Sequence, residues 1–215
     1  MAYPISKWII PPIYSPWIRK VEGIENIPRD KPFIIAANHS SYFDALLVPV
    51  IVAPAINKKI HPLVNSYYWK NPITRFFLDL WESIPVYVSK ENDAKEKNKT
   101  AFEKALSYLK KGELAMIFPE GGRSKDGKLQ RAYAGIAKLA IKAMVPVLPV
   151  GIIDANKVLP IGKILPSFAR CEVKIGKPMS FDKYHGKKPA SKILNHITRS
   201  IMKEIAKLTN QKYNY

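Results

Sequence analysis

Residues 32–53 read PFIIAANHSSYFDALLVPVIVA, in which the polar stretch NHSSYFD (38–44) separates two apolar runs. The first run is short and begins after a proline, which is typical of a buried strand. The second run is longer and follows Asp44, which favours a helix that begins near this residue. Burying titratable groups is costly unless they are paired. His39 and Asp44 of this stretch therefore form either a structural hydrogen bond or a functional site.

Strand-like and helix-like segments alternate along the rest of the chain. Short apolar runs predict further strands at 61–65, 83–89, 113–118, 145–152 and 170–176. Apolar residues at helical spacing predict helices at 71–81, 93–111, 132–145 and 189–209. This alternation is typical of a single α/β domain with a largely parallel central sheet flanked by helices. In such a sheet, functional sites lie at the carboxyl ends of the strands.

The charge of the chain is strongly unbalanced. Its 215 residues include 35 lysines and arginines against 17 aspartates and glutamates, which gives a formal net charge of +18. Such an excess favours an anionic partner, namely nucleic acid, an acidic membrane surface or a phosphorylated substrate, although a solvated lysine-rich surface has the same composition. No nucleic-acid-binding motif is found and the lysines are spread along the chain, so nucleic acid is not expected as the partner.

The cysteine and histidine content bounds the chemistry further. The single cysteine, Cys171, excludes a disulfide within the chain and favours a reducing compartment. No cluster of cysteine and histidine has the spacing of a zinc site, so no metal is expected. We interpret His61, His185 and His196 as structural or surface residues.

The first 18 residues have an unusual composition. Tryptophan, tyrosine and isoleucine occur among four prolines, which exclude one continuous helix, and two cations follow. This mixture suits a membrane interface. We therefore divide the chain into a membrane-interface segment (1–18) and a main domain (19–215), the alternative being that the segment packs on the core. The side chains expected to insert are Trp8, Ile9, Ile10, Ile13 and Trp17.

Neither a signal peptide nor a membrane span is expected from the sequence. The N-terminal residues lack a basic region followed by an apolar stretch and a cleavage site. No segment reaches the roughly 20 apolar residues that a spanning helix needs.

A second polar stretch, FPEGGRSKDGK (118–128), follows the strand predicted at 113–118. It carries Glu120 and Arg123 on a glycine-rich turn, and its position matches that of NHSSYFD at the end of a strand. Part of it has the glycine and lysine spacing of a phosphate-binding loop. However, Leu129 stands where that loop requires a serine or threonine for magnesium, so nucleotide hydrolysis is not expected. No Gly-x-Ser-x-Gly elbow of a serine hydrolase is present either.

Together, NHSSYFD and FPEGGRS resemble the signature blocks of the glycerolipid acyltransferase superfamily, whose best-known members acylate 1-acyl-glycerol-3-phosphate to phosphatidic acid. VPVLPVGI (145–152) resembles a further block, and VEGIENIP (21–28) resembles the segment before the first strand. The resemblance implies that 19–215 is an acyltransferase domain. It also implies that His39 and Asp44 are catalytic, and that substrates contact Glu120, Gly121, Gly122, Arg123 and Ser124.

The resemblance also implies the reactants. The acyl donor would be acyl-CoA or acyl-carrier protein, used as a substrate with no further cofactor, and the acceptor would be a lysophospholipid. The protein would work on an anionic membrane surface, as a peripheral or monotopic protein on the cytoplasmic face. Two rivals remain open: a nucleic-acid-binding protein, which the charge alone permits, and a lipid-binding relative without activity, which the intact His39–Asp44 pair argues against.

The sequence departs from the family pattern in two places. In ESIPVYV (82–88), Glu82 replaces a glycine and Val88 replaces an arginine associated with the acceptor phosphate. Lys90 lies two residues on and is a candidate substitute. After the second polar stretch, Tyr133 stands where many members have a lysine, and Arg131 lies nearby. The acceptor is therefore 1-acyl-glycerol-3-phosphate, another lysophospholipid or an amine-bearing lipid.

Acyl transfer from a thioester to an alcohol explains these residue types. A neutral imidazole removes the hydroxyl proton near pH 7, and a carboxylate on its other nitrogen fixes the tautomer. The substrate hydroxyl is then the nucleophile, so no enzyme serine is needed. Arg123 offers a bidentate fork for a phosphate, with Lys125 and Lys128 adding weaker attraction. For Glu120 two roles stay open: it holds Arg123, or it accepts a hydrogen bond from an acceptor hydroxyl.

Overall fold

The computed structural model describes residues 6–88, 93–184 and 189–215, with side chains from Ile9 onward in the first range. In these residues the chain forms one seven-stranded sheet of order β1-β7-β6-β2-β5-β3-β4. Neighbouring strands are parallel except β6 and β7, which are antiparallel. The strands are β1 (Ile18–Glu22), β2 (Ile34–Ala37), β3 (Ile60–Asn65), β4 (Ile84–Val86), β5 (Leu114–Ile117), β6 (Val147–Ile153) and β7 (Cys171–Ile175).

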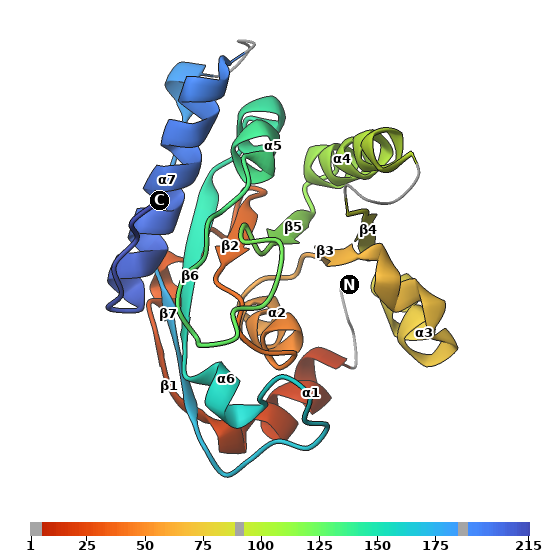
Figure 1. The fold of residues 1–215 in the computed structure, drawn as a ribbon, viewed down its shortest axis with the longest axis vertical. Coiled ribbons are helices and arrows are strands. Elements are labelled where there is room, and N and C mark those ends of the chain that lie inside the picture. The colour runs from red at the N-terminus through yellow and green to blue at the C-terminus, as the bar shows by residue number, and fades with distance from the viewer. Residues whose placement is uncertain (1–5, 89–92, 185–188) are drawn as a thin grey trace.

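Helices cover both faces of the sheet (Figure 1). They are α1 (Ser6–Tyr14), α2 (Asp44–Ala55), α3 (Pro72–Leu80), α4 (Ala94–Lys110), α5 (Gly135–Ala143), α6 (Ala155–Val158) and α7 (Ser191–Leu208). In β2, Ile34 and Ala36 pack into one core with α4, α5 and α7, whereas Ile35 and Ala37 pack into the other with α2 and α6. This explains the uninterrupted apolar run at 32–37, because a central parallel strand is buried on both faces.

The predicted fold class is confirmed, and each strand and helix predicted from 32 onward is found within a few residues of its expected position. The N-terminal segment differs from expectation. It forms the helix α1 despite Pro11 and Pro12 in its interior, then a 3-10 turn (Ser15–Trp17). The strand β1 begins at Ile18, so the boundary expected after residue 18 falls inside a strand. Packing of α1 against α2 offsets the backbone hydrogen bonds that the prolines remove.

The N-terminal segment is attached to the stretch that holds His39 and Asp44. Tyr14 stacks on Phe43 with ring centroids 4.6 Å apart, and Trp17 meets the same ring edge-on at 6.2 Å. Trp17 Nε1 also donates to the Ser167 carbonyl at 2.8 Å. Ile9 and Ile13 are exposed, whereas Ile10 is half-buried. Trp8 lies outside the described side chains. Inspection of the described helices finds none with the length and apolar character needed to cross a bilayer.

The helix α3 is well formed but contributes nothing to the core. Asn71 caps it, since its side-chain oxygen accepts from the backbone of Ile73 and Thr74, and Pro72 occupies the first position. All nine residues of α3 are described, and none of them is buried. Its apolar stripe, formed by Ile73, Phe76, Phe77 and Leu80, faces outward.

Candidate active site

The two polar stretches lie side by side. NHSSYFD follows the carboxyl end of β2 and FPEGGRS follows that of β5, and these strands are parallel neighbours. The stretches are joined through backbone atoms, because Ser124 N donates to the His39 carbonyl at 2.8 Å and His39 N donates to Glu120 Oε1 at 3.0 Å. The expectation that each stretch follows the end of a strand is therefore confirmed, and both lie at the same end of the sheet. A site built from them is open to a ligand at the strand ends.

His39 and Asp44 form a hydrogen-bonded pair. His39 Nδ1 lies 2.9 Å from Asp44 Oδ2. The carboxylate is fully buried, whereas the imidazole keeps about 15% of its surface exposed. The ring stacks on Phe118 with centroids 3.9 Å apart and 12° between the planes. With Nδ1 occupied by the carboxylate, Nε2 is the nitrogen left to exchange a proton with a substrate.

The start of α2 positions the carboxylate. Asp44 is the first residue of the helix, where the helix dipole favours negative charge. Its Oδ2 also accepts from Ser40 N at 2.7 Å and Ser41 N at 2.8 Å, so one oxygen receives three donors. The other oxygen, Oδ1, is buried without a hydrogen-bond partner among the described residues. The five-residue spacing of His39 and Asp44 thus corresponds to one tight turn closed on a single carboxylate oxygen.

Asn38 fixes the other end of this turn, a role that the sequence did not reveal. Its side-chain amide donates to the Ile152 carbonyl at 2.8 Å and its oxygen accepts from Ile152 N at 2.7 Å. The side chain thereby continues the pairing of β2 with β6 beyond the end of β2. His39, the next residue, leaves the sheet from a rigid point.

Glu120 links two loops through their backbones. Oε1 accepts from His39 N, and Oε2 accepts from Gln130 N at 2.8 Å. Burial raises the pKa of the Glu120 carboxyl to about 7, although the two backbone donors act in the opposite direction and the nearby Asp44 charge adds to the rise. No ion pair joins Glu120 to Arg123 in the described residues. Of the two roles considered from the sequence, holding Arg123 is therefore wrong, and contact with an acceptor hydroxyl stays a prediction.

Arg123 lies flat on an aromatic ring beside the pair. Its guanidinium carbon is 3.5 Å from the centroid of the Tyr42 ring, and Nη2 is 3.4 Å from the Tyr68 hydroxyl. Nη1 is buried with no hydrogen-bond partner in the described part of the chain. A buried guanidinium donor without a partner is costly, and an anionic group would satisfy it. Tyr42 and Tyr68, which orient Arg123, were not identified from the sequence, because only the fold brings residue 68 next to residue 123.

The other residues predicted to contact substrates differ from one another in burial and in local contacts. Gly121 has φ +71°, and a Cβ at that position would lie 2.8 Å from the Tyr133 ring, so glycine is required there. Gly122 is exposed and has open space around it. Ser124 is buried and donates to Asp126 at 2.9 Å, which makes it a loop-shaping residue. Arg131 is exposed. Lys90 lies outside the described residues.

The departure at Glu82 has a local explanation. Glu82 has φ +50°, in the left-handed region that favours glycine, which is the residue that the family resemblance implies at this position. In this chain the Glu82 carboxylate pairs with Lys59, and its carbonyl lies 3.2 Å from Nδ1 of the buried His61. His61 also contacts Glu113 at 2.9 Å, so it is a structural histidine, as interpreted.

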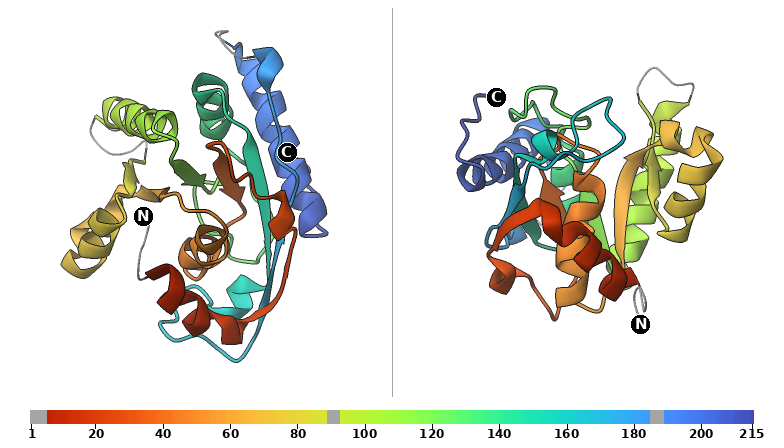
Figure 2. Two further views of the ribbon diagram at one scale, coloured as in Figure 1. Left: turned by 180° about the vertical axis from the view of Figure 1, so that it is seen from behind. Right: turned by 90° about the horizontal axis from the view of Figure 1, so that it is seen from below.

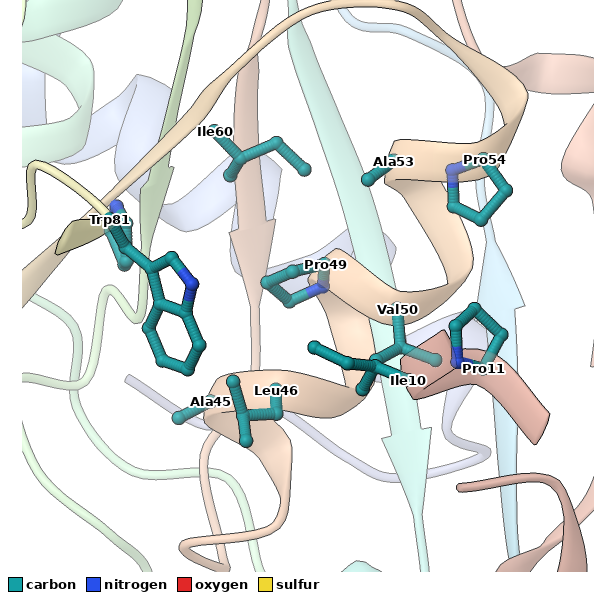
Figure 3. Close-up of a pocket in the computed structure, with 11 residues that line it drawn as sticks. Ile10, Pro11, Ala45, Leu46, Pro49, Val50, Ala53, Pro54, Ile60 and Trp81 are labelled. Carbon is teal, nitrogen blue, oxygen red and sulfur yellow. The ribbon is translucent and has the colours of Figure 1, made fainter. Parts of the chain in front are cut away.

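An apolar pocket of about 60 Å³ runs along α2, beginning one residue after Asp44 (Figure 3). Its walls come from α1, α2, β3 and the turn after α3. They are formed by Ile10, Pro11, Ala45, Leu46, Pro49, Val50, Ala53, Pro54, Ile60, Pro62 and Trp81. The pocket therefore joins the histidine–aspartate turn to the N-terminal helix through one apolar surface.

Residues 18–153, from β1 to the end of β6, match the profile of a family described as Acyltransferase. The chain belongs to this family. Both polar stretches lie within the matched residues, and with them the pair His39–Asp44 and the residues Glu120 and Arg123. The resemblance read from NHSSYFD and FPEGGRS is therefore confirmed at the level of the acyltransferase family.

Individual members of the acyltransferase family show the same relationship. A 1-acyl-sn-glycerol-3-phosphate acyltransferase of Bacillus subtilis is 29% identical over 194 residues, which cover 89% of this chain and 88% of the relative. A chloroplastic 1-acyl-sn-glycerol-3-phosphate acyltransferase of Arabidopsis thaliana is 28% identical over 72% of this chain. That alignment covers only 41% of the plant protein, so this chain spans about two-fifths of its length.

A solved structure extends the likeness to the fold. The crystal structure of the 1-acyl-sn-glycerophosphate acyltransferase PlsC from Thermotoga maritima superposes with a TM-score of 0.65 at 27% identity. The match covers 91% of this chain and 73% of the Thermotoga protein. The α/β architecture is thus shared with an acyltransferase over nearly the whole chain.

Proposed function

We propose that this protein transfers a fatty acyl group from acyl-CoA or acyl-carrier protein to the free hydroxyl of a lysophospholipid, most directly 1-acyl-glycerol-3-phosphate, to give phosphatidic acid. The observation that carries the proposal is the contact of His39 Nδ1 with buried Asp44 Oδ2 at 2.9 Å. It lies beside a guanidinium with an unpaired donor, in a chain of the acyltransferase family. The relatives named for 1-acyl-glycerol-3-phosphate support this choice of acceptor.

The proposed step uses the substrate as the nucleophile. His39 Nε2 takes the proton of the acceptor hydroxyl while the hydroxyl oxygen attacks the thioester carbonyl. Asp44 keeps the proton on Nδ1 and stabilises the imidazolium that forms. The tetrahedral intermediate then collapses, the carbon–sulfur bond breaks, and the thiolate leaves with the proton from Nε2. The products are an ester and a free thiol, with the imidazole restored to its neutral form.

Arg123 is the proposed contact for the acceptor phosphate. Its Nη1 is buried without a partner in the described residues, and the stacking on Tyr42 holds the guanidinium plane in place. A phosphate oxygen would satisfy this donor with a charge-assisted hydrogen bond. Gly121 and Gly122 allow the turn that carries Arg123, while Lys90 and Arg131 remain candidate additional contacts.

The apolar pocket along α2 is the proposed place for part of an acyl chain. It begins at Ala45, directly after the aspartate of the pair, and its described lining is apolar apart from backbone atoms and the Trp81 ring nitrogen. In the close-up, Trp81 lies on one side of the labelled set, Pro11 and Pro54 lie on the other, and Pro49 lies between them (Figure 3). Burying methylene groups contributes about 0.8 kcal/mol each, which would hold the lipid while its polar end reacts.

We also propose that the protein works as a peripheral or monotopic protein on an anionic membrane surface, on the cytoplasmic face. The acceptor and product are amphiphiles that reside in bilayers, and the net charge of +18 favours anionic headgroups. Within the N-terminal segment (1–18), Ile9 and Ile13 are exposed and remain candidates for insertion, whereas Trp17 is engaged with Phe43.

An acceptor panel tests the proposed reaction. Purified protein is incubated with labelled acyl-CoA or acyl-carrier protein and with each lysophospholipid in turn, and an amine-bearing lipid is included. We expect phosphatidic acid to form fastest from 1-acyl-glycerol-3-phosphate, and His39→Ala to abolish its formation. Faster acylation of another acceptor would reassign the substrate, and equal transfer by wild type and His39→Ala would remove the proposed mechanism.

A further inference from the structure

The helix α3 presents a continuous apolar surface to solvent. Ile73, Phe76 and Leu80 are 69%, 64% and 62% exposed, and Phe77 is 46% exposed. The helix is nevertheless firmly built, with its Asn71 cap and a hydrogen bond from Trp69 Nε1 to Asp79 at 2.8 Å. It packs mainly on the preceding turn (Ser66–Lys70). An ordered helix that exposes four large apolar side chains needs a partner that covers them.

A second apolar surface lies in the segment 160–168. Ile164, Leu165 and Phe168 are 92%, 80% and about 100% exposed. The base of the segment is held by Ser167, whose amide donates to the Val158 carbonyl at 2.7 Å and whose hydroxyl donates to the Lys157 carbonyl at 2.7 Å. The exposed side chains are therefore presented by an anchored loop.

Both surfaces leave the sheet at the end that holds His39 and Glu120. The turn and helix α3 follow the carboxyl end of β3, and 160–168 follows that of β6 through α6. These strands are parallel to β2 and β5, whose carboxyl ends carry the two polar stretches. In the view from below in Figure 2, α1 lies against α2, the helix that begins at Asp44, and α3 stands farther out, beyond β3.

We propose that α3 and the segment 160–168 insert into the headgroup region of an anionic bilayer and so hold the site against the membrane. The proposal rests on the proposed function and names elements outside the N-terminal segment. A bilayer is the occupant that the charges favour. Lys70 and Lys163 flank the two apolar surfaces, and neither ammonium group has a carboxylate partner among the described residues. An apolar surface bordered by cations is typical of an interfacial element.

Vesicle flotation with paired substitutions tests this docking surface. The variants are Phe76→Ser with Leu80→Ser in α3, and Leu165→Ser with Phe168→Ser in the loop. All four side chains are exposed, so both variants should fold as the wild type does. With vesicles of phosphatidylglycerol and phosphatidylcholine, we expect each variant to bind at least about tenfold more weakly, because two inserted side chains are lost. Binding of the wild type should fall with added salt.

Ile24→Ser is the matched control. Ile24 is also exposed, but it follows β1. Because β1 is parallel to β7 and β7 is antiparallel to β6, β1 ends at the opposite end of the sheet from the two polar stretches. It should float like the wild type. Equal flotation of the wild type and both variants would overturn the proposal. It would also be overturned if the wild type were a dimer and both variants were monomers, since the surface would then bind a second copy of the chain. The rate of acyl transfer to a water-soluble short-chain acceptor should be the same in the variants as in the wild type. If the wild type transferred no acyl group to this acceptor, the result would count against the proposed function and not against the docking surface.

An independent feature is a basic groove of about 340 Å³ between the loop before α5, the start of α7 and the last residues. Its cations are Arg131, Lys192 and Arg199, and its rings are Tyr213 and Tyr215. None of the described residues that line it is acidic, and these three cations have no ion pair within the described ranges. The Tyr213 hydroxyl accepts from Ala132 N at 3.1 Å, which fixes one wall.

The groove is connected to the site by two hydrogen bonds. Arg131 follows Gln130, whose amide donates to Glu120, and Glu120 also accepts from His39 N. The groove therefore borders the loop that Glu120 ties to the backbone of His39. Both acyl-CoA and acyl-carrier protein carry the acyl group on a long phosphopantetheine arm. The geometry points to the groove as the site for the phosphate-bearing end of this arm, an inference that also rests on the proposed function.

Donors with and without the phosphate test the groove. For Lys192→Ala with Arg199→Ala, we expect the KM for acyl-CoA or acyl-carrier protein to rise about tenfold with kcat unchanged, because two phosphate contacts are lost. The acyl thioester of N-acetylcysteamine lacks the phosphate and should be used equally by variant and wild type. Lys203→Ala, an exposed lysine of the same helix outside the groove, is the control.

The comparison of donors also separates the sources of the phosphate. A rise in KM for only one donor assigns the groove to that donor. An unchanged KM for both donors in the double variant overturns the inference. Calorimetry measures the binding of 4′-phosphopantetheine to the wild type and to the double variant. Weaker binding to the double variant would support the groove as the phosphate site. If no acceptor were acylated at the same time, only the proposed function would fail.

Discussion

Asp44 and Glu120 are two buried carboxylates of one site that receive different donors. In Asp44 one oxygen accepts from the His39 ring and from two backbone amides, while the other has no partner in the described residues. In Glu120 each oxygen accepts from one backbone amide, and no side chain in the described residues donates to it. Burial raises the pKa of Glu120 to about 7. The first carboxylate orients the imidazole, and the second holds the backbone that carries it.

The comparison shows that the role of a buried carboxylate depends on which hydrogen-bond donors it receives. Asp44 contacts the imidazole that is the base of the proposed reaction, so its charge would contribute to the proton transfer. Glu120 acts on His39 N and Gln130 N, so its effect on the reaction runs through the position of two loops. Substitutions at the two carboxylates, and at His39, which both of them contact, separate the two roles.

Removing the imidazole should have the largest effect. His39→Ala deletes the proposed base while the backbone amide that donates to Glu120 remains. We expect kcat to fall by at least about a hundredfold, because proton transfer by a positioned base contributes that much. Steady-state kinetics with 1-acyl-glycerol-3-phosphate measures the loss, and thermal unfolding checks that the variant is folded. Turnover close to that of the wild type would show that His39 is not the base.

Asp44→Asn should come next, with kcat lowered about a hundredfold and KM little changed. Ser40 N and Ser41 N require an acceptor, so the amide oxygen should occupy the Oδ2 position and keep the ring oriented. The negative charge that stabilises the imidazolium is lost, and the amide nitrogen falls at the buried, unpaired Oδ1 position. Steady-state measurement of kcat and KM for Asp44→Asn and His39→Ala under the same conditions tests this expectation. An effect on KM alone would make Asp44 a structural residue.

Glu120→Gln should reduce activity less, by about tenfold. One amide hydrogen would face His39 N or Gln130 N, and a buried donor left without an acceptor costs about 1 to 3 kcal/mol. Because the two loops shift, kcat and KM should change together. A loss as large as that of His39→Ala, with unchanged stability, would instead place Glu120 in direct contact with the reacting groups.

Stability against pH gives a second test of Glu120. Its pKa is about 7 in the folded protein against an ordinary value of 4.5, so the folded state keeps a proton that the unfolded chain has already lost between these values. The contribution of Glu120 to the free energy of unfolding therefore falls as the pH rises from its ordinary pKa of 4.5 to about 7. Between about pH 5 and about pH 8, urea unfolding should show that the wild type loses about 2 to 3 kcal/mol more than Glu120→Gln. Parallel pH profiles would contradict the raised pKa.

Arg123→Lys should have the smallest effect, and it tests the charge next to the two carboxylates. The charge remains, but the planar fork that stacks on Tyr42 is lost. We expect the KM for 1-acyl-glycerol-3-phosphate to rise about fivefold to tenfold with little change in kcat, since one charge-assisted hydrogen bond is lost. The KM for a lysolipid without a free phosphate should not change. An equal rise for both acceptors would remove Arg123 as the phosphate contact.

The fold was predictable because its signals are local. An apolar run of strand length bounded by polar residues, as at 32–37, defines a buried strand whatever surrounds it. Asn71 and Pro72 likewise mark the start of α3 through contacts within one turn. The N-terminal helix α1 was not predicted, because its prolines argue against a helix and the packing on α2 that stabilises it is not visible in the sequence.

The sequence by itself determined the alternating strands and helices, the His39–Asp44 turn and the family, since each depends on residues close together in the chain or on a motif. Only the tertiary structure decided that Glu120 accepts from His39 N, that Tyr42 and Tyr68 hold Arg123, and that the apolar stripe of α3 faces outward. These contacts join residues tens of positions apart, and their geometry follows from the order and direction of the strands. Helical periodicity shows that a helix has an apolar side, but the neighbours that the fold supplies decide whether that side is buried.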